Sequence, residues 1–152
     1  MPALPGEERS RDVALGYALL RVIVGLNVLS HGVSRILAGP STYAANLVVQ
    51  FQSTPLANGL VSAFGMSLPW IEAVLGLLLL LGIKMRWTVL AAGALLAALT
   101  YGACLVQDWQ AAGLQLIYAM VYALLLILRQ WNTFSVDGIF IKRTAPESTP
   151  AL

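Results

Sequence analysis

The sequence predicts an all-α integral membrane protein, a bundle of four transmembrane helices with a short outward-facing surface helix between the first and the second. Composition is the first observation, because 59% of the 152 residues are hydrophobic and only 11% are charged, against roughly 25% charged in a soluble domain. The second is a set of four apolar stretches, three of them near the ~20 residues that cross a hydrocarbon core. The third is the uneven distribution of lysine and arginine along the chain.

The expected membrane helices follow the apolar stretches in order, at about 13–36, 69–83, 87–106 and 111–129. The stretch 69–83 is short for a span at about 1.5 Å per residue. We therefore expect it to extend backward over residues 60–68, to tilt, or to lean on other helices. Residues 41–51 open with a Ser-Thr pair typical of a helix start and then mix apolar and amide side chains, which predicts the surface helix.

Polar segments flank the membrane domain, which we expect to occupy residues 13–141. Residues 1–12 are predicted to be a cytoplasmic segment, residues 133–141 an extended or surface-lying stretch, and the Pro, Ser and Thr-rich residues 142–152 a disordered tail. A cleaved signal peptide is the alternative for the first apolar stretch, because Arg9 and Arg11 precede it. No convincing small-x-small cleavage site follows, so we favour a retained helix.

The basic residues predict the orientation. Seven of the nine fall where four crossings place one side of the membrane, namely Arg9, Arg11, Lys84, Arg86, Arg129, Lys142 and Arg143. By the positive-inside rule both termini are then cytoplasmic. Each tryptophan also falls at a predicted helix boundary, where the headgroup layer favours it, namely Trp70, Trp87, Trp109 and Trp131. The net charge of +2 thus reflects topology, and no basic stripe with interleaved aromatics indicates nucleic-acid binding.

Glu72 is the leading candidate for a functional residue, since a carboxylate inside an apolar helix is costly in lipid unless a cation or a cavity meets it. The first helix carries Asn27, His31 and Arg35 at successive i, i+4 positions, which share one stripe. We expect Glu72 to pair with His31 or Arg35, because the predicted topology places all three at similar depth. Such a cluster either fixes helix register or holds a quinone oxygen or relays a proton, because His and Glu can change charge near neutral pH when perturbed.

Arg21 is expected to need a different partner, because it lies about 15 Å from His31 along the helix. Three alternatives remain: it snorkels to the cytoplasmic surface, meets Asp137 of the tail, or binds a lipid headgroup or a ligand. The polar face formed by Gln115, Tyr118 and Tyr122 on the last helix is interpreted as core packing. Small residues at helical spacing predict close helix packing or self-association, notably Gly16, Gly25, Gly32, Gly93, Ala97, Ala98 and Gly102.

Metal and nucleotide chemistry is not expected within this chain. One histidine and one cysteine cannot supply the pair of axial ligands that a membrane b-type haem usually requires, nor a three-ligand zinc site. No CxxC, GxGxxG, GxSxG or P-loop pattern occurs either. The chain is therefore not expected to be a redox enzyme by itself.

Several short motifs, in order and with their spacing, resemble the DoxX/DoxD-like family of small four-helix membrane proteins over about residues 15–139. They are Leu20-Arg21 with Gly25, His31-Gly32, Glu72 with Gly76 and the leucine run to Gly82, Lys84-Met85-Arg86, and Ser135-Val136-Asp137-Gly138. The family commonly has a lysine three or four residues after the His-Gly pair, where this chain has Arg35. The long segment after the first helix and the Pro69-Trp70 pair are less typical of the family.

The resemblance implies a subunit of an oxidoreductase complex in a bacterial or archaeal inner membrane, like the thiosulfate:quinone oxidoreductase subunits that gave the family its name. It implies quinone as a cofactor, a redox subunit as partner, and a polar pocket for a quinone head or a partner's acidic or sulfur-bearing group. Carried over by motif, the cofactor-binding positions are Arg21, His31, Arg35 and Glu72.

Three function classes remain open at this point. The first is a quinone-interacting subunit that receives electrons from a partner. The second is a structural or assembly subunit that anchors a partner, in which Glu72 serves packing. The third is a small proton-coupled transporter, although the sequence has no inverted repeat or pair of broken helices.

Overall fold

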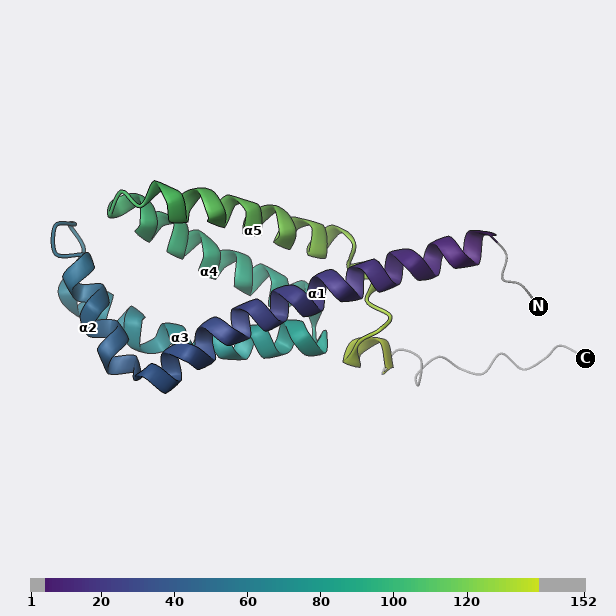
Figure 1. Ribbon diagram of the computed structural model, residues 1–152, viewed down its shortest axis with the longest axis horizontal. Helices are drawn as coiled ribbons and strands as arrows, with labels where there is room; N and C mark the ends of the chain where they lie inside the picture. Colours follow the sequence, from purple (N-terminus) through teal and green to yellow (C-terminus); the bar gives the residue numbers. More distant parts are fainter. Residues whose placement is uncertain (1–4, 140–152) are drawn as a thin grey trace, which may run out of the picture.

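The computed structural model describes residues 5–139, and this part of the chain is helical and contains no strand (Figure 1). The elements are α1 (Pro5–Ala38), α2 (Pro40–Gln50), α3 (Asn58–Leu81), α4 (Met85–Leu105), α5 (Trp109–Ile127) and the 3-10 turn η1 (Arg129–Trp131). Within the described residues α1, α3, α4 and α5 are long and apolar enough to cross a membrane, with mean hydropathy between 1.7 and 1.9. The predicted four-helix membrane fold is confirmed, and a short helix does follow the first span.

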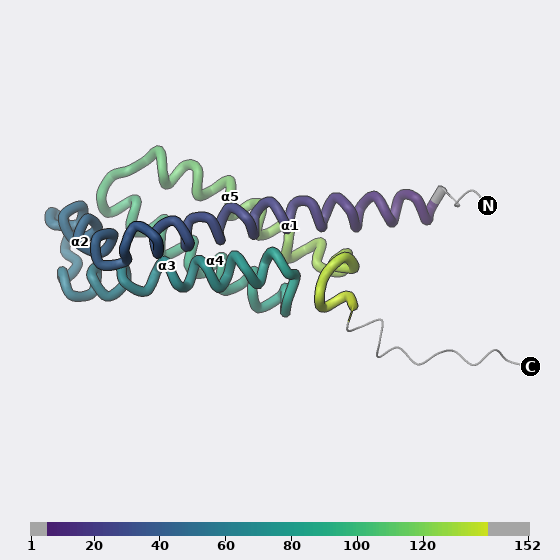
Figure 2. The backbone as a smooth tube through the Cα atoms, turned by 60° about the horizontal axis from the view of Figure 1, so that its bottom comes forward, coloured from purple at the N-terminus to yellow at the C-terminus, as the bar shows by residue number. Residues whose placement is uncertain are grey.

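The spans form two pairs, α1 with α3 and α4 with α5. The short helix α2 packs against α3, so α1, α2 and α3 form one layer (Figure 2). The α4–α5 pair diverges from this layer toward the end at which α2 lies (Figure 1). At the opposite end, the first turns of α1 project beyond the other helices.

Glycines allow α1 and α3 to approach at backbone distance. A Cβ atom on Gly32 would be 2.4 Å from the Ala73 nitrogen, and one on Gly76 would be 2.3 Å from the Leu29 nitrogen. Gly25 is in a similar position beside α3, whereas a Cβ on Gly16 would meet nothing within 4 Å. Close packing within the chain is therefore confirmed for Gly25 and Gly32 and does not involve Gly16, for which self-association stays a prediction. Such contacts require residues without side chains, as is common between membrane helices.

The start of α3 differs from the expected boundary at residue 69, because the helix begins at Asn58 and continues through Pro69. The backward extension is confirmed. Proline lacks the N–H that an interior helical position donates, and here its ring is fully buried, where neighbouring helices make such an interruption tolerable. As a result Trp70 lies within α3 rather than at its end, and the boundary pattern holds only for Trp87, Trp109 and Trp131.

Both ends of the chain also differ from expectation. Helix α1 begins at Pro5 rather than near residue 13, and its first turn carries Glu7 and Glu8, which favour a helix N-terminus. After α5 the chain turns back and forms a helical turn at 136–139, where the Ile139 amide donates to the Ser135 carbonyl at 3.1 Å. This segment is therefore not extended. The expected disordered tail at 142–152, with Lys142 and Arg143, lies outside the described residues.

The buried core lies at the end of the bundle away from α2. Its members come from the four spans, namely Tyr17, Val24, Leu75, Leu79, Met85, Val89, Ala92, Tyr122 and Leu125. The core thus holds the helix pairs together where α3 ends and α4 begins. Toward α2 the space between the pairs is occupied by the cavities described next.

Candidate functional site

An ion pair between Arg35 of α1 and Glu72 of α3 is the centre of the candidate site. One guanidinium nitrogen of Arg35 donates to both carboxylate oxygens of Glu72. The Glu72 side chain is 7% exposed and that of Arg35 is 26% exposed. Of the two expected partners, the structure therefore selects Arg35, and it is the only ion pair among residues 5–139.

Tyr43 of α2 adds a second contact to Arg35. The guanidinium carbon lies 4.7 Å from the centroid of the Tyr43 ring, within the ~6 Å at which a cation is attracted to a ring face. Burial raises the pKa of Tyr43 above its ordinary value, and the Arg35 charge partly opposes this shift. The phenol thus stays neutral at physiological pH, and Arg35 links α1, α2 and α3.

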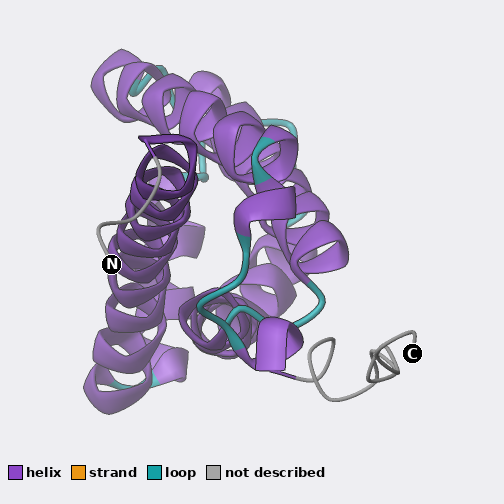
Figure 3. Ribbon diagram, turned by 90° about the vertical axis from the view of Figure 1, so that its right-hand side faces the viewer, coloured by secondary structure: helices purple, strands orange, loops and turns teal. Residues whose placement is uncertain are grey.

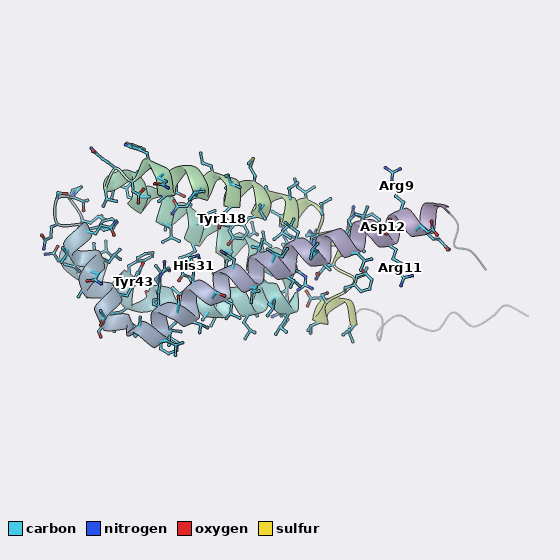
Figure 4. All side chains as sticks on the ribbon, in the orientation of Figure 1. Arg9, Arg11, Asp12, His31, Tyr43 and Tyr118 are labelled. Atoms are coloured by element: carbon cyan, nitrogen blue, oxygen red, sulfur yellow. The ribbon has the colours of Figure 1, made fainter. Side chains whose placement is uncertain are left out.

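Beside the ion pair, a cavity of about 180 Å³ lies between the two helix pairs. Its polar side chains come from α1, α3 and α5, namely Asn27, His31, Arg35, Glu72, Gln115, Tyr118 and Tyr122. His31 on α1 and Tyr118 on α5 lie on facing sides of these helices (Figure 4). Both are exposed, so the cavity opens onto the molecular surface.

Gln115 carries a buried acceptor that the described residues leave unsatisfied. Its Oε1 atom is inaccessible to solvent and accepts no hydrogen bond from residues 5–139. Buried polar atoms without a partner are uncommon, because desolvation costs free energy that a hydrogen bond normally recovers. This atom belongs to a residue that lines the polar cavity, where a bound group could donate to it.

A larger cavity of about 480 Å³ adjoins the polar one on the side of α2. The two share Arg35, Leu99 and Gln115. Most of the larger cavity is apolar, with α2 and the segment after it contributing Leu47, Phe51 and Leu56. Its volume falls in the range of ~300–1,000 Å³ typical of small-molecule sites. The smaller cavity thus has the greater share of polar side chains, while apolar atoms form most of the lining of both.

Arg21 does not join this site. Its guanidinium donates to the carbonyl oxygens of Leu79 at 2.7 Å, Leu80 at 2.5 Å and Phe134 at 2.8 Å. Asp137, one of its expected partners, instead accepts a hydrogen bond from the Met85 amide at 3.4 Å. Arg21 therefore caps the last turn of α3, where a cation complements the helix dipole, and fastens the segment after α5 to it.

Sequence reasoning identified His31, Arg35 and Glu72 but interpreted the polar face of α5 as packing. The structure places Gln115, Tyr118 and Tyr122 across the cavity from them. The sequence did indicate that these three side chains share one helix face, because Gln115 lies three residues before Tyr118 and Tyr122 lies four residues after it. Tyr43 gave no comparable signal, because its contact depends on how α2 folds back.

Among residues 5–139 no three His, Cys, Asp or Glu side chains gather as a metal site would require. Comparison of the chain with protein-family models, curated proteins and solved structures yields no match. The fold and the site define the class on their own: a multi-pass helical membrane protein with two adjoining cavities between its helix pairs, the smaller of which is richer in polar side chains.

Proposed function

We propose that this chain is a DoxX-like membrane subunit of a quinone-linked oxidoreductase complex, in which the polar cavity binds the quinone head. The observation that carries the proposal is the junction of a polar cavity with an apolar one at Arg35, Leu99 and Gln115. A quinone is divided in the same way, since its ring bears oxygen atoms and its isoprenoid chain is apolar. The ring oxygens would lie among the polar side chains and the chain among the apolar ones.

The cavity offers both kinds of hydrogen-bonding group that such a head requires. Asn27, His31 and Tyr118 can donate to a ring carbonyl, and the unpartnered Gln115 Oε1 can accept from the hydroxyl of the reduced form. A bound quinone supplies two-electron, two-proton redox chemistry. His31 and Glu72 are the side chains in the cavity able to gain or lose a proton for it.

Electrons would come from a second subunit, because one histidine cannot supply the axial pair that a membrane b-type haem usually requires and one cysteine cannot hold an iron–sulfur cluster. The role proposed for this chain is thus to bind quinone within the membrane and to hold a redox partner beside it. Activity is expected only in the assembled complex.

The alternative is a purely structural or assembly subunit, and one observation favours it. Glu72 already has both carboxylate oxygens occupied by Arg35, as a pair that only fixes the register of two helices would have. The unpartnered acceptor of Gln115 weighs against this reading, because a purely structural cavity gains nothing from it.

The decisive experiment measures quinone bound to the protein after purification in mild detergent, with mass spectrometry of extracted lipids and of co-purifying proteins. Two variants test the cavity: Gln115→Leu removes the free acceptor, and Tyr118→Phe removes a hydroxyl without changing the ring. We expect quinone at a near-stoichiometric ratio in the wild type and at least a five-fold loss in each variant. Glu8→Gln, an exposed carboxylate outside the cavity, is the matched control and should retain quinone.

Recovery of a redox subunit without quinone from every form would reject the quinone site and leave the anchoring role. Quinone that remains in Gln115→Leu and Tyr118→Phe at the wild-type ratio would place its binding elsewhere. Circular dichroism of each variant shows whether a loss of quinone reflects the cavity or a loss of fold.

A further inference from the structure

A third cavity, of about 610 Å³, lies at the end of the bundle away from α2. It is formed by the turn between α3 and α4, the start of α4, and the segment from the end of α5 onward. Figure 3 views the molecule from this end, where the loops after α3 and α5 lie near each other. A hydrogen bond from the Asn132 side-chain amide to the Gly82 carbonyl, at 3.2 Å, joins them.

The cavity is basic. Lys84, Arg86 and Arg129 line it together with a single carboxylate, Asp137. That carboxylate accepts from the Met85 amide and pairs with none of the three cations. Within the part of the chain that the structure describes, all three are thus free of ion pairs. Three exposed, unpaired cations around one hollow favour an anion there.

The position of the cavity indicates which anion. It lies at the ends of three spans, and Trp87 in its lining is 66% exposed, as expected of an indole in the headgroup layer. The Arg86 guanidinium lies 5.6 Å from the centroid of this ring. An anion at this level of a bilayer is a phosphodiester headgroup, and basic pockets between membrane helices suit such headgroups.

An apolar groove of about 630 Å³ runs along α4 and α5, and its lining begins within one helical turn of the basic cavity, at Val89 on α4 and Leu126 on α5. On α4 it follows Leu90, Gly93 and Ala97, which share a helix face with Arg86 at four- and three-residue spacing. On α5 it follows Leu126, Ala123 and Ala119, and Leu126 comes three residues before Arg129 of η1. A Cβ atom on Gly93 would meet nothing within 4 Å, so the groove is open there.

We infer that an anionic phospholipid binds at this end, with its phosphodiester among Lys84, Arg86 and Arg129 and one acyl chain in the α4–α5 groove. Two independent features carry the inference: the unpaired cations and the groove that begins beside them. This site is separate from the one proposed for quinone, since it lies at the opposite end of the spans and the inference holds whether or not quinone binds.

Quenching of Trp87 fluorescence by brominated lipids tests the inference. The full-length chain with Trp70, Trp109 and Trp131 each changed to Phe is reconstituted in phosphatidylcholine, and brominated phosphatidylglycerol or brominated phosphatidylcholine is added at equal mole fraction. We expect stronger quenching by the anionic lipid. Each removed cation, in Arg86→Gln or Arg129→Gln, should reduce the preference about five-fold, the factor that corresponds to ~1 kcal/mol per basic residue near a membrane.

Two further variants separate the alternatives. Arg9→Gln/Arg11→Gln removes two basic residues from the projecting part of α1, outside the cavity (Figure 4), and should leave the preference intact. Gly93→Leu fills the groove without changing charge and should weaken quenching by the anionic lipid. Equal quenching by the two lipids would overturn the inference, as would an equal loss in the Arg9/Arg11 variant. Quenching without lipid preference but sensitive to inorganic phosphate would indicate a phosphate site and would also overturn it.

Discussion

Gly32 of α1 lies directly against the backbone of Ala73 in α3, and a Cβ atom added to Gly32 would be 2.4 Å from the Ala73 nitrogen. This approach sets the register of the two helices. Arg35 follows Gly32 by one turn and Glu72 precedes Ala73, so the same contact places the cation opposite the carboxylate. The ion pair therefore depends on a glycine that does not itself contact any charge.

Replacing Gly32 with Ala should destabilise the protein, because the new methyl group forces α1 and α3 apart. Overpacking of this kind costs about 1–3 kcal/mol, measurable as the free energy of unfolding in mixed detergent and dodecyl sulfate. Gly93→Ala is the matched control, since a Cβ there meets nothing within 4 Å. Equal losses in the two variants would mean that the α1–α3 approach is not what limits stability.

Arg35 and Glu72 should be energetically coupled, with Arg35→Gln the more damaging single change. It leaves a carboxylate that is only 7% exposed without a cation, whereas Glu72→Gln leaves a cation that is 26% exposed. We expect a loss of about 3 kcal/mol for Arg35→Gln, the lower end of the range for a broken buried pair, and less for Glu72→Gln. A double-mutant cycle should give a coupling energy of about 1–3 kcal/mol; additive single effects would contradict the pair.

Arg21 should be required to hold the segment after α5 on the bundle. Arg21→Lys keeps the positive charge, but a lysine ammonium lacks the planar guanidinium that donates to three separate carbonyl oxygens here. A single hydrogen bond to a charged group is worth about 1.5–3 kcal/mol, so we expect a loss of at least this size. The movement of this segment is measured as the rate at which a thiol reagent labels Ser135→Cys. Cys104→Ser is included so that the new cysteine is the only one in the chain. The labelling rate should rise in Arg21→Lys and stay unchanged in Arg9→Lys; if neither changes, the guanidinium does not fasten this segment.

Tyr43 should make stability depend on pH only in the alkaline range. Its pKa in the folded protein is raised above the ordinary tyrosine value of 10.0, chiefly by burial. The unfolded chain therefore loses this proton first, so the stabilisation is complete below pH 10 and is lost as pH rises through the folded pKa. Unfolding at pH 8 and pH 11 should show a smaller alkaline loss in Tyr43→Phe than in the wild type. Parallel losses would show that other groups dominate.

The spans were predictable because hydropathy is a local property of the sequence. The Arg35–Glu72 pair was also within reach, since two charges at similar depth on neighbouring apolar helices have few other partners. The backward extension of α3 was predictable from the shortness of 69–83, but the exact start was not, because Pro69 normally ends a helix and only the structure shows it as a buried interior residue.

The partners of Arg21 show a second limit of sequence reasoning. They are backbone carbonyl oxygens at the end of α3 and after α5, and every residue carries such an oxygen. No residue type marks them, so only the folded chain reveals which ones converge. Gln115 illustrates the converse, because its polarity was visible in the sequence but its lack of a partner appears only in the structure.

The exposure of His31 and Tyr118 at the polar cavity has a consequence for how the site fills. Both lie within helices of membrane-spanning length, so we expect the opening of the cavity to face the acyl chains of the bilayer. An apolar ligand is then expected to enter from the membrane, in which it is already dissolved. Occupancy should follow the mole fraction of that ligand among the lipids, and diluting the membrane with added lipid should empty the site even when the amount of ligand in the sample stays constant.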